Sequence, residues 1–398
     1  MLAAELVLAL REELTETEAL PTPDYQPLNA SLEPRFFGAG GPRMAAAGVD
    51  LAFDLTTHSV IGLSDALKSY FKFRRLFQQL RQLALERQPE AIVCVDFSGF
   101  NRRFAHAIKE YVRSRQDWFH DWAPKVIQYV SPQVWASREA RVYQMARDYD
   151  LVLSTFPFEK DWYAKRVPKL PVEFVGNPLV DRYANQKSTE TPIGAADLLT
   201  DRNAKVLLLP GSRRAELVRH VPVLAEVARR LAAAQAASFR MVLPNAELAE
   251  LARCLLKGAS TIEVQTGDLE QALPEADLAI TKSGTITMEC AYSGVPAVVF
   301  YKTSMFNYLV GKQVVNVKHL AMPNLLANET VFPEFVQSDA TPANLTRAAL
   351  ELLRDNARRQ QVQAKLASII SALGGPGASR RAARAIVRLL NPYPKVVT

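Results

Sequence analysis

The 398-residue sequence has few cysteines, scattered histidines and no long hydrophobic run. Its three cysteines, Cys94, Cys254 and Cys290, are odd in number and far apart, which excludes a disulfide framework and a zinc-knuckle spacing. The five histidines share no ligand spacing, so we expect neither a protein-bound metal nor a cofactor. No apolar run approaches the roughly 18 residues that a bilayer-spanning helix requires. These absences favour a reduced, cytoplasmic protein.

The composition is that of a globular protein with an excess of positive charge. Hydrophobic residues make up 48% and charged residues 22%, which excludes wholesale disorder, and the length suits two or three domains. The formal charge of +7 favours an anionic partner, such as a nucleotide or a phospholipid surface. The N-terminal MLAAELVLALREEL lacks the basic leader of a signal peptide and predicts an amphipathic helix. The residues expected on its buried face are Leu2, Leu6, Leu8 and Leu10.

Short β-branched runs alternate with longer helical patterns along most of the chain. The predicted strands are 91–97, 125–130, 150–154, 172–175, 205–209, 238–243, 261–265, 277–280 and 297–301. Several are apolar throughout, as strands covered on both faces are. The predicted helices include 66–85, 214–235, 284–293 and a basic helix at 380–390, whereas the proline-containing stretch 16–34 predicts a surface loop. The alternation predicts an α/β fold of doubly wound parallel sheets, with a boundary between two Rossmann-like halves near 176–200.

Two glycine turns in the second half have the pattern of anion-binding sites. In LLLPGSRRAE (207–216), Gly211 allows close backbone approach, the helix start offers free N–H groups and Arg213 supplies a fork for phosphate. In TKSGTITMEC (281–290), an SGT turn precedes a helix whose Glu289 can accept from a sugar hydroxyl. Taken singly, the first turn is as well explained by an ordinary strand–helix turn, and the second is better explained by an N-cap pair on a packing helix. Together they favour a nucleotide diphosphate-sugar.

The first half offers a candidate base and a basic helix. Asp96 follows the apolar strand AIVCV, where a carboxylate can act as general base toward a hydroxyl, although an isolated Asp there is more often a turn cap. The stretch 66–85 carries five basic residues, no acid and an aromatic stripe, which favours a membrane surface. A core-packed helix with a solvated basic face is the alternative, and RNA binding is disfavoured because no aromatic-rich sheet motif is present.

Nine stretches, in chain order, resemble one family: the lipid-A-disaccharide synthases, inverting glycosyltransferases with the GT-B fold. They are 36–50, 95–103, 129–142, 156–163, 174–181, 208–216, 283–301, 322–337 and 373–379. YVSPQVWA (129–136) together with LPGSR (209–213) is the specific signal. The resemblance implies two Rossmann-like domains facing a cleft, with residues 1–180 on the acceptor and membrane side and 181–373 on the UDP-sugar side. Residues 374–398 would form a basic helix that packs back on the first domain or is exchanged in a homodimer.

The implied reaction transfers 2,3-diacylglucosamine from UDP to 2,3-diacylglucosamine 1-phosphate. It forms the β-1,6-linked disaccharide of lipid A and UDP, for lipopolysaccharide biosynthesis, by a peripheral protein on the inner face of the inner membrane. The implied catalytic residues are Asp96 as base and Arg213 beside the leaving diphosphate. The implied UDP-sugar contacts are Gly211, Ser212, Arg213, Glu216, Ser283, Gly284, Thr285, Glu289 and Asn324. The implied membrane contacts are Lys68, Phe71, Lys72, Arg74 and Arg75.

In the family, a hydrophobic strand and a G-E-x-S-G-D loop precede the helix that LAAELVLALREEL resembles, and this sequence has no matching residues. A truncated, non-catalytic paralogue that binds UDP-sugar or lipid is therefore one alternative. A GT-B glycosyltransferase with a different acceptor is another, although YVSPQVW and MPNLL speak against it.

Overall fold

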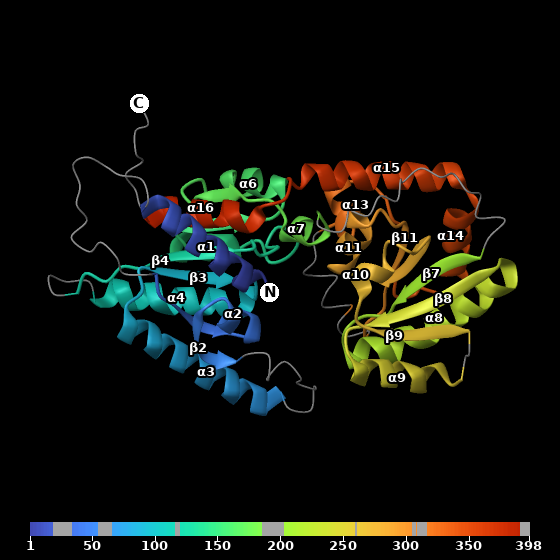
Figure 1. Ribbon diagram of the computed structural model, residues 1–398, viewed down its shortest axis with the longest axis horizontal. Coiled ribbons are helices and arrows are strands. Elements are labelled where there is room, and N and C mark those ends of the chain that lie inside the picture. Colours follow the sequence, from blue (N-terminus) through green and yellow to red (C-terminus); the bar gives the residue numbers. More distant parts are fainter. Residues whose placement is uncertain are drawn as a thin grey trace. The chain divides into compact units, whose positions relative to one another are not determined.

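The computed structural model describes residues 1–18, 34–54, 66–115, 120–184, 203–258, 261–304, 308 and 317–390, without the side chains of 66–72 and 184. The chain divides into two compact units (Figure 1). Unit 1 comprises Met1–Pro178 together with Gly374–Thr398, and unit 2 is the continuous segment Leu179–Leu373.

All paired strands of unit 1 are parallel and lie in two sheets. Strands β3 (Ala91–Val95), β4 (Lys125–Tyr129), β5 (Leu151–Ser154) and β6 (Val172–Phe174) form one sheet in that order. Strands β1 (Phe36–Gly40) and β2 (Val49–Asp54) form a separate pair. The helices are α1 (Leu2–Glu18), α2 (Pro42–Ala46), α3 (Ala66–Arg87), α4 (Ser98–Arg115), α5 (Arg141–Asp148), α6 (Pro157–Ala164), α16 (Ala378–Leu390) and, at the junction with unit 2, α7 (Pro178–Ala184).

Helix α16 returns from the end of unit 2 and packs against α1 (Figure 1). Buried Leu6 and Leu10 of α1 share a hydrophobic cluster with Ile386 and with β4 and β5. Polar contacts reinforce this packing, because Nε atoms of both Arg380 and Arg384 donate to Oε1 of the largely buried Glu13, at 2.9 and 2.8 Å. The last helix is therefore part of the core of unit 1.

Unit 2 contains one six-stranded parallel sheet in the order β12-β11-β10-β7-β8-β9. The strands are β7 (Ala204–Leu209), β8 (Ala237–Leu243), β9 (Ile262–Thr266), β10 (Leu278–Lys282), β11 (Ala297–Tyr301) and β12 (Glu334–Val336). The helices are α8 (Arg214–Ala234), α9 (Ala246–Leu256), α10 (Leu269–Ala272), α11 (Ile286–Tyr292), α13 (Met322–Ala327), α14 (Pro342–Arg354) and α15 (Asn356–Ala372). Numbered within the unit, this order is the Rossmann order 3-2-1-4-5-6, and its switch point lies between β7 and β10.

Helices cover both faces of this sheet. Helix α8 packs between α9 and α14, whereas α11, α13 and α15 pack on one another. Right-handed crossovers that leave the central strand in opposite directions place α8 and α11 on opposite faces. Strands β7 and β10 are consequently buried on both sides, which is why most of their residues are apolar.

The α/β fold with parallel sheets is confirmed, and all nine predicted strands are present within two residues at each end. Three strands were not predicted: β1, β2 and β12. Two details were wrong. Helix α1 continues through residues 16–18, and the remainder of the proposed loop, from 19 to 33, lies outside the described residues. Leu8 is 50% exposed, because the residues of α1 that face the core are spaced around Leu6 and Leu10.

Candidate functional site

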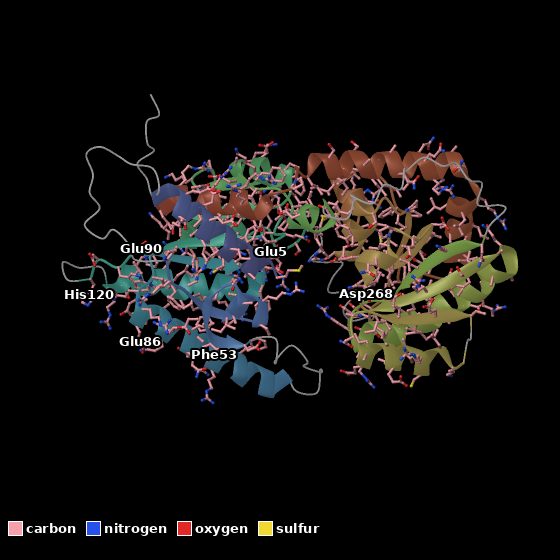
Figure 2. All side chains as sticks on the ribbon, viewed as in Figure 1. Glu5, Phe53, Glu86, Glu90, His120 and Asp268 are labelled. Atoms are coloured by element: carbon pink, nitrogen blue, oxygen red, sulfur yellow. The ribbon has the colours of Figure 1, made fainter. Side chains whose placement is uncertain are left out.

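A cavity of about 550 Å³ lies within unit 2, at the carboxyl ends of β7, β8, β9 and β10. This edge contains the β7/β10 switch point, where doubly wound sheets bind their ligands. Asp268, labelled in Figure 2, follows β9 at this edge with a left-handed backbone. The lining residues that also bear on the chemistry are Gly211, Ser212, Asp268, Lys282, Thr285 and Glu289.

The turn between β7 and α8 requires glycine at Gly211. Its φ of +124° favours glycine, and a Cβ there would lie 2.2 Å from Oε2 of Glu216. Arg213 is the exposed N-cap residue of α8 and supplies no side-chain cap, so the first N–H groups of this 21-residue helix stay open. The helix start and the Arg213 guanidinium therefore offer donors and positive charge to an anion.

The turn between β10 and α11 presents a second glycine to the cavity edge. Gly284 has a φ of +138°, and both Gly284 and Thr285 are exposed. Ser283 points elsewhere, because its hydroxyl donates to the carbonyl of Leu320 at 2.9 Å. Of this predicted SGT motif, Thr285 lines the cavity directly.

An ion pair joins the two turns. Nζ of Lys282 lies 3.0 Å from Oε1 of Glu216, while Oε2 of the same carboxylate accepts the Ser212 N–H at 2.9 Å. Burial by itself raises the pKa of Glu216, but the hydrogen bond and charge of Lys282 outweigh it and leave the pKa below its usual range. Glu216 is thus a charged link that holds the first turn in shape.

Glu289 lies in the wall of the cavity, under a pair of stacked tyrosines. The hydroxyl of Tyr183 donates to Oε2 of Glu289 at 3.1 Å, and the Tyr183 ring stacks on Tyr292 at 5.6 Å. Burial raises the pKa of Glu289. Its remaining oxygen is a candidate acceptor for a ligand hydroxyl, as the sequence suggested.

Of the predicted UDP-sugar contacts, Gly211, Ser212, Thr285 and Glu289 line the cavity, whereas Arg213, Glu216, Ser283, Gly284 and Asn324 are not among its lining residues. Of these, Asn324 is engaged within the protein. Its side chain is fully buried. Its amide donates to the carbonyl of Phe332 and to Glu334, and its oxygen accepts the N–H groups of Val331 and Phe332. The capacity of this amide is used to hold the segment before β12, so Asn324 has a structural role in this conformation.

Asp96 lies in unit 1, directly after β3 and at the carboxyl edge of its sheet. Asp96 and Phe97 both have positive φ, +49° and +32°, which is strained for side chains other than glycine. The strained backbone is held by Asn101, which donates to the Asp96 carbonyl at 2.8 Å, and by Gln128, which donates to the same oxygen at 3.2 Å. The carboxylate itself is exposed and has no hydrogen-bond partner among the described residues.

A ladder of aromatic rings leads from Asp96 to α3. Phe97 is 55% exposed and stacks on Phe100 at 5.9 Å, while Phe73 of α3 lies 6.4 Å from Phe97 and is 39% exposed. Further along α3, Phe77 packs on Phe100 and Phe104.

The helix predicted at 66–85 is confirmed as α3. Arg74 and Arg75 are exposed on it, whereas the side chains of Lys68, Phe71 and Lys72 lie outside the description. None of the described helices is long and apolar enough to cross a membrane.

Solved structures with this fold define the class. The UDP-GlcNAc 2-epimerase from Neisseria meningitidis, bound to UDP-GlcNAc, matches with a TM-score of 0.57 at 12% identity, over 98% of this chain and 97% of that one. MurG from Acinetobacter baumannii matches with a TM-score of 0.50 at 14% identity, over 89% of this chain and all of that one. The two units with their parallel sheets are those of the GT-B class.

Sequence comparison defines the family within this class. A family model described as lipid-A-disaccharide synthetase matches residues 20–387. The lipid-A-disaccharide synthase of Geobacter sulfurreducens is 33% identical over 358 residues, which are 89% of each chain, and that of Myxococcus xanthus is 32% identical over 98% of this chain and 94% of the relative. The chain belongs to the lipid-A-disaccharide synthetase family of glycosyltransferases.

Proposed function

We propose that this glycosyltransferase transfers 2,3-diacylglucosamine from UDP to 2,3-diacylglucosamine 1-phosphate and forms the β-1,6-linked disaccharide of lipid A. The observation that carries the proposal is the combination of family membership with a cavity at the switch point of unit 2, built from two glycine turns. The donor and acceptor parts of the reaction are assigned separately to the two units.

The donor cavity suits a sugar nucleotide. The diphosphate would bind at the open start of α8 and at Arg213, where helix N–H groups and a guanidinium meet negative charge. Negative charge on the diphosphate grows as the sugar leaves, so these donors stabilise the transition state more than the ground state. The ligand would also come close to the backbone of the two turns, at Gly211, Ser212, Gly284 and Thr285. Glu289 would accept from a hydroxyl, and Ser283 and Glu216 would act by shaping the turns.

The acceptor part rests on Asp96. A general base must reach the proton it removes, and the exposed carboxylate of Asp96 has free oxygens at a ligand-binding sheet edge. The strained backbone at Asp96 and Phe97 is fixed by hydrogen bonds, so the carboxylate is positioned before substrate arrives. We therefore assign Asp96 as the general base that removes the proton of the attacking acceptor hydroxyl.

The membrane part rests on α3 and the aromatic ladder. Both proposed substrates carry acyl chains, and exposed Phe73 and Phe97 provide an apolar surface between the candidate base and the cationic Arg74 and Arg75. Together with Lys68, Phe71 and Lys72, these residues would dock the protein on the anionic inner face of the inner membrane. In this structure α16 packs on α1 of its own chain. A homodimer that exchanges the last segment would form the same contacts between two chains and stays a prediction.

The test is a product assay with the purified full chain. Supplied with UDP-diacylglucosamine and diacylglucosamine 1-phosphate, the protein should release UDP and form one phosphorylated disaccharide, seen by thin-layer chromatography. Transfer to another acceptor in place of diacylglucosamine 1-phosphate would contradict the proposed acceptor. Tight UDP binding without any disaccharide would contradict the enzymatic function and favour the non-catalytic alternative.

A further inference from the structure

Four arginines gather at the carboxyl edge of the unit 1 sheet, beside the segment that carries Asp96. Arg102 and Arg103 lie in the first turns of α4, which follows β3. Arg138 precedes α5 and Arg141 begins it, after β4. The two helices pack on each other, and Arg102 of α4 donates to Gln144 of α5.

The four arginines are close enough for their charges to act on one another. Burial lowers the pKa of Arg141, and the charges of Arg138, Arg102 and Arg103 each lower it further. Like charges held together destabilise the folded protein unless an anion compensates them.

No carboxylate of the described residues pairs with any of these four arginines. Glu139, which lies between Arg138 and Arg141 in the sequence, is paired with Arg166. Arg102 donates to the neutral amide oxygen of Gln144. Asp148, at the far end of α5, is buried against His106, Arg113 and Arg147. The positive charge of the cluster is therefore not neutralised by a carboxylate of the described residues and is available to an anionic ligand.

The helix that carries Arg102 and Arg103 is attached to the segment that carries the candidate base. Asn101, which directly precedes Arg102, donates to the carbonyls of Val95 and Asp96 at 3.1 and 2.8 Å. The start of α4 is thereby tied to the Asp96 backbone. Arg103 and Arg138 are exposed, while Arg102 and Arg141 are half-buried. A ligand can therefore reach the cluster from solvent and contact two arginines that are partly shielded from water.

We propose that Arg102, Arg103, Arg138 and Arg141 form a binding site for a phosphate monoester, and that its ligand is the sugar phosphate of the acceptor. The identification of the ligand rests on the proposed function. Guanidinium groups bind phosphate in bidentate geometry, and the start of α4 adds N–H groups at the same edge. In glucosamine 1-phosphate, C1 bears the phosphate and C5 bears the CH2OH group, and both carbons flank the ring oxygen. Binding the phosphate here would direct the hydroxyl of that group toward Asp96.

The decisive experiment compares two acceptors in detergent micelles: diacylglucosamine 1-phosphate and the same lipid without its phosphate. Arg141→Gln and Arg138→Gln should each raise the KM for the phosphorylated acceptor about tenfold or more and leave the KM for the other unchanged, because each removes a charge-assisted contact. Arg115→Gln, which removes the same charge from the exposed end of α4, is the matched control and should change neither. Equal losses with both acceptors would overturn the proposal.

A second readout separates this inference from the proposed function. Calorimetric titration of the full chain with soluble glucosamine 1-phosphate should show binding that glucosamine lacks and that Arg141→Gln weakens, whether or not disaccharide is made. Thermal unfolding guards against a structural effect: removing a repelled charge should keep or raise the Tm. If Arg141→Gln reduces binding to anionic vesicles but leaves the glucosamine 1-phosphate affinity unchanged, a lipid headgroup is the ligand and the acceptor assignment is wrong.

Discussion

Lys282, the last residue of β10, is paired at 3.0 Å with Glu216 in the first turn of α8. The Ser212 N–H donates to the other oxygen of the same carboxylate at 2.9 Å. Two glycine turns separated by about 70 residues in the chain thus depend on one carboxylate. A substitution in one turn should therefore also change the affinity of a ligand that binds at the other turn.

Glu216→Gln should weaken UDP binding even though Glu216 has no free oxygen for the ligand. The substitution removes a charged hydrogen bond worth about 1.5–3 kcal/mol, so the Kd for UDP should rise about tenfold. Titration calorimetry measures it. Glu226→Gln on the same helix, where Glu226 pairs only with exposed Arg229 and Arg230, is the control. Equal effects of both substitutions would remove Glu216 from the site.

Arg213→Ala should reduce kcat about 10²-fold or more, because in the proposed function the guanidinium stabilises the charge that grows on the departing UDP. Steady-state rates at saturating donor measure it. Arg219→Ala is matched, since Arg219 is exposed on α8 and its guanidinium donates to the Ala215 carbonyl of its own helix. A near-normal kcat for Arg213→Ala would show that this residue does not assist departure.

Asp96→Asn should lower transfer by about 10²–10⁴-fold while UDP affinity is retained, because the change removes a base and alters little volume. Product formation and UDP titration are the paired measurements. Asp161→Asn, on the exposed surface of α6, should leave both unchanged. If UDP affinity falls together with turnover in Asp96→Asn, the carboxylate has a structural role.

Glu159 should make the stability of unit 1 depend on pH. Burial raises its pKa from an ordinary 4.5 to about 7, although Trp135 donates to it at 2.9 Å. Between these pH values the folded state holds a proton that the unfolded state has lost, so stability falls as pH rises through this range. Relative to Glu159→Gln, the wild type should lose about 3 kcal/mol between pH 4 and pH 8.

Urea unfolding followed by tryptophan fluorescence measures this difference, since all four tryptophans of the chain lie in the segment 118–162 of unit 1. The same pH dependence in wild type and Glu159→Gln would assign the effect to other groups.

Arg74→Gln combined with Arg75→Gln should weaken binding to anionic vesicles about 30-fold at low salt. Each basic residue near such a surface contributes about 1 kcal/mol, and salt screens the effect. Co-sedimentation at two salt concentrations measures it, with Arg229→Gln and Arg230→Gln on α8 as a control of equal charge. Transfer in detergent should change much less. Unchanged vesicle binding would support the alternative of a solvated helix face.

The sequence predicts the fold well where burial dominates. The apolar strands such as β7 and β10 are covered on both faces, so their composition identifies them directly. Strand β1 contains two glycines in five residues and β12 has only three residues, so neither carries a strand pattern. These strands form because a parallel neighbour supplies their hydrogen bonds, which local sequence does not report.

The candidate site is predictable only in part for the same reason. The glycine turns have local signatures, whereas Tyr183 reaches Glu289 across 106 residues of sequence. Lys282 was missed although it stands beside the SGT turn, because nothing local indicates a partner in α8. The ligand contact of Asn324 stays a prediction: its four hydrogen bonds lie within its own loop and strand, and a motif does not separate a ligand contact from a structural one.

The packing of α16 on α1 also dictates an order of events during synthesis. The ribosome produces all of unit 2 before it produces the helix that completes the core of unit 1. Because domains fold as their chain emerges, unit 2 can reach its final state while unit 1 still exposes Leu6, Leu10 and the surface of β4 that α16 covers. The N-terminal half of the protein is therefore made first and finished last, and it is the part that most needs protection from aggregation in the interval.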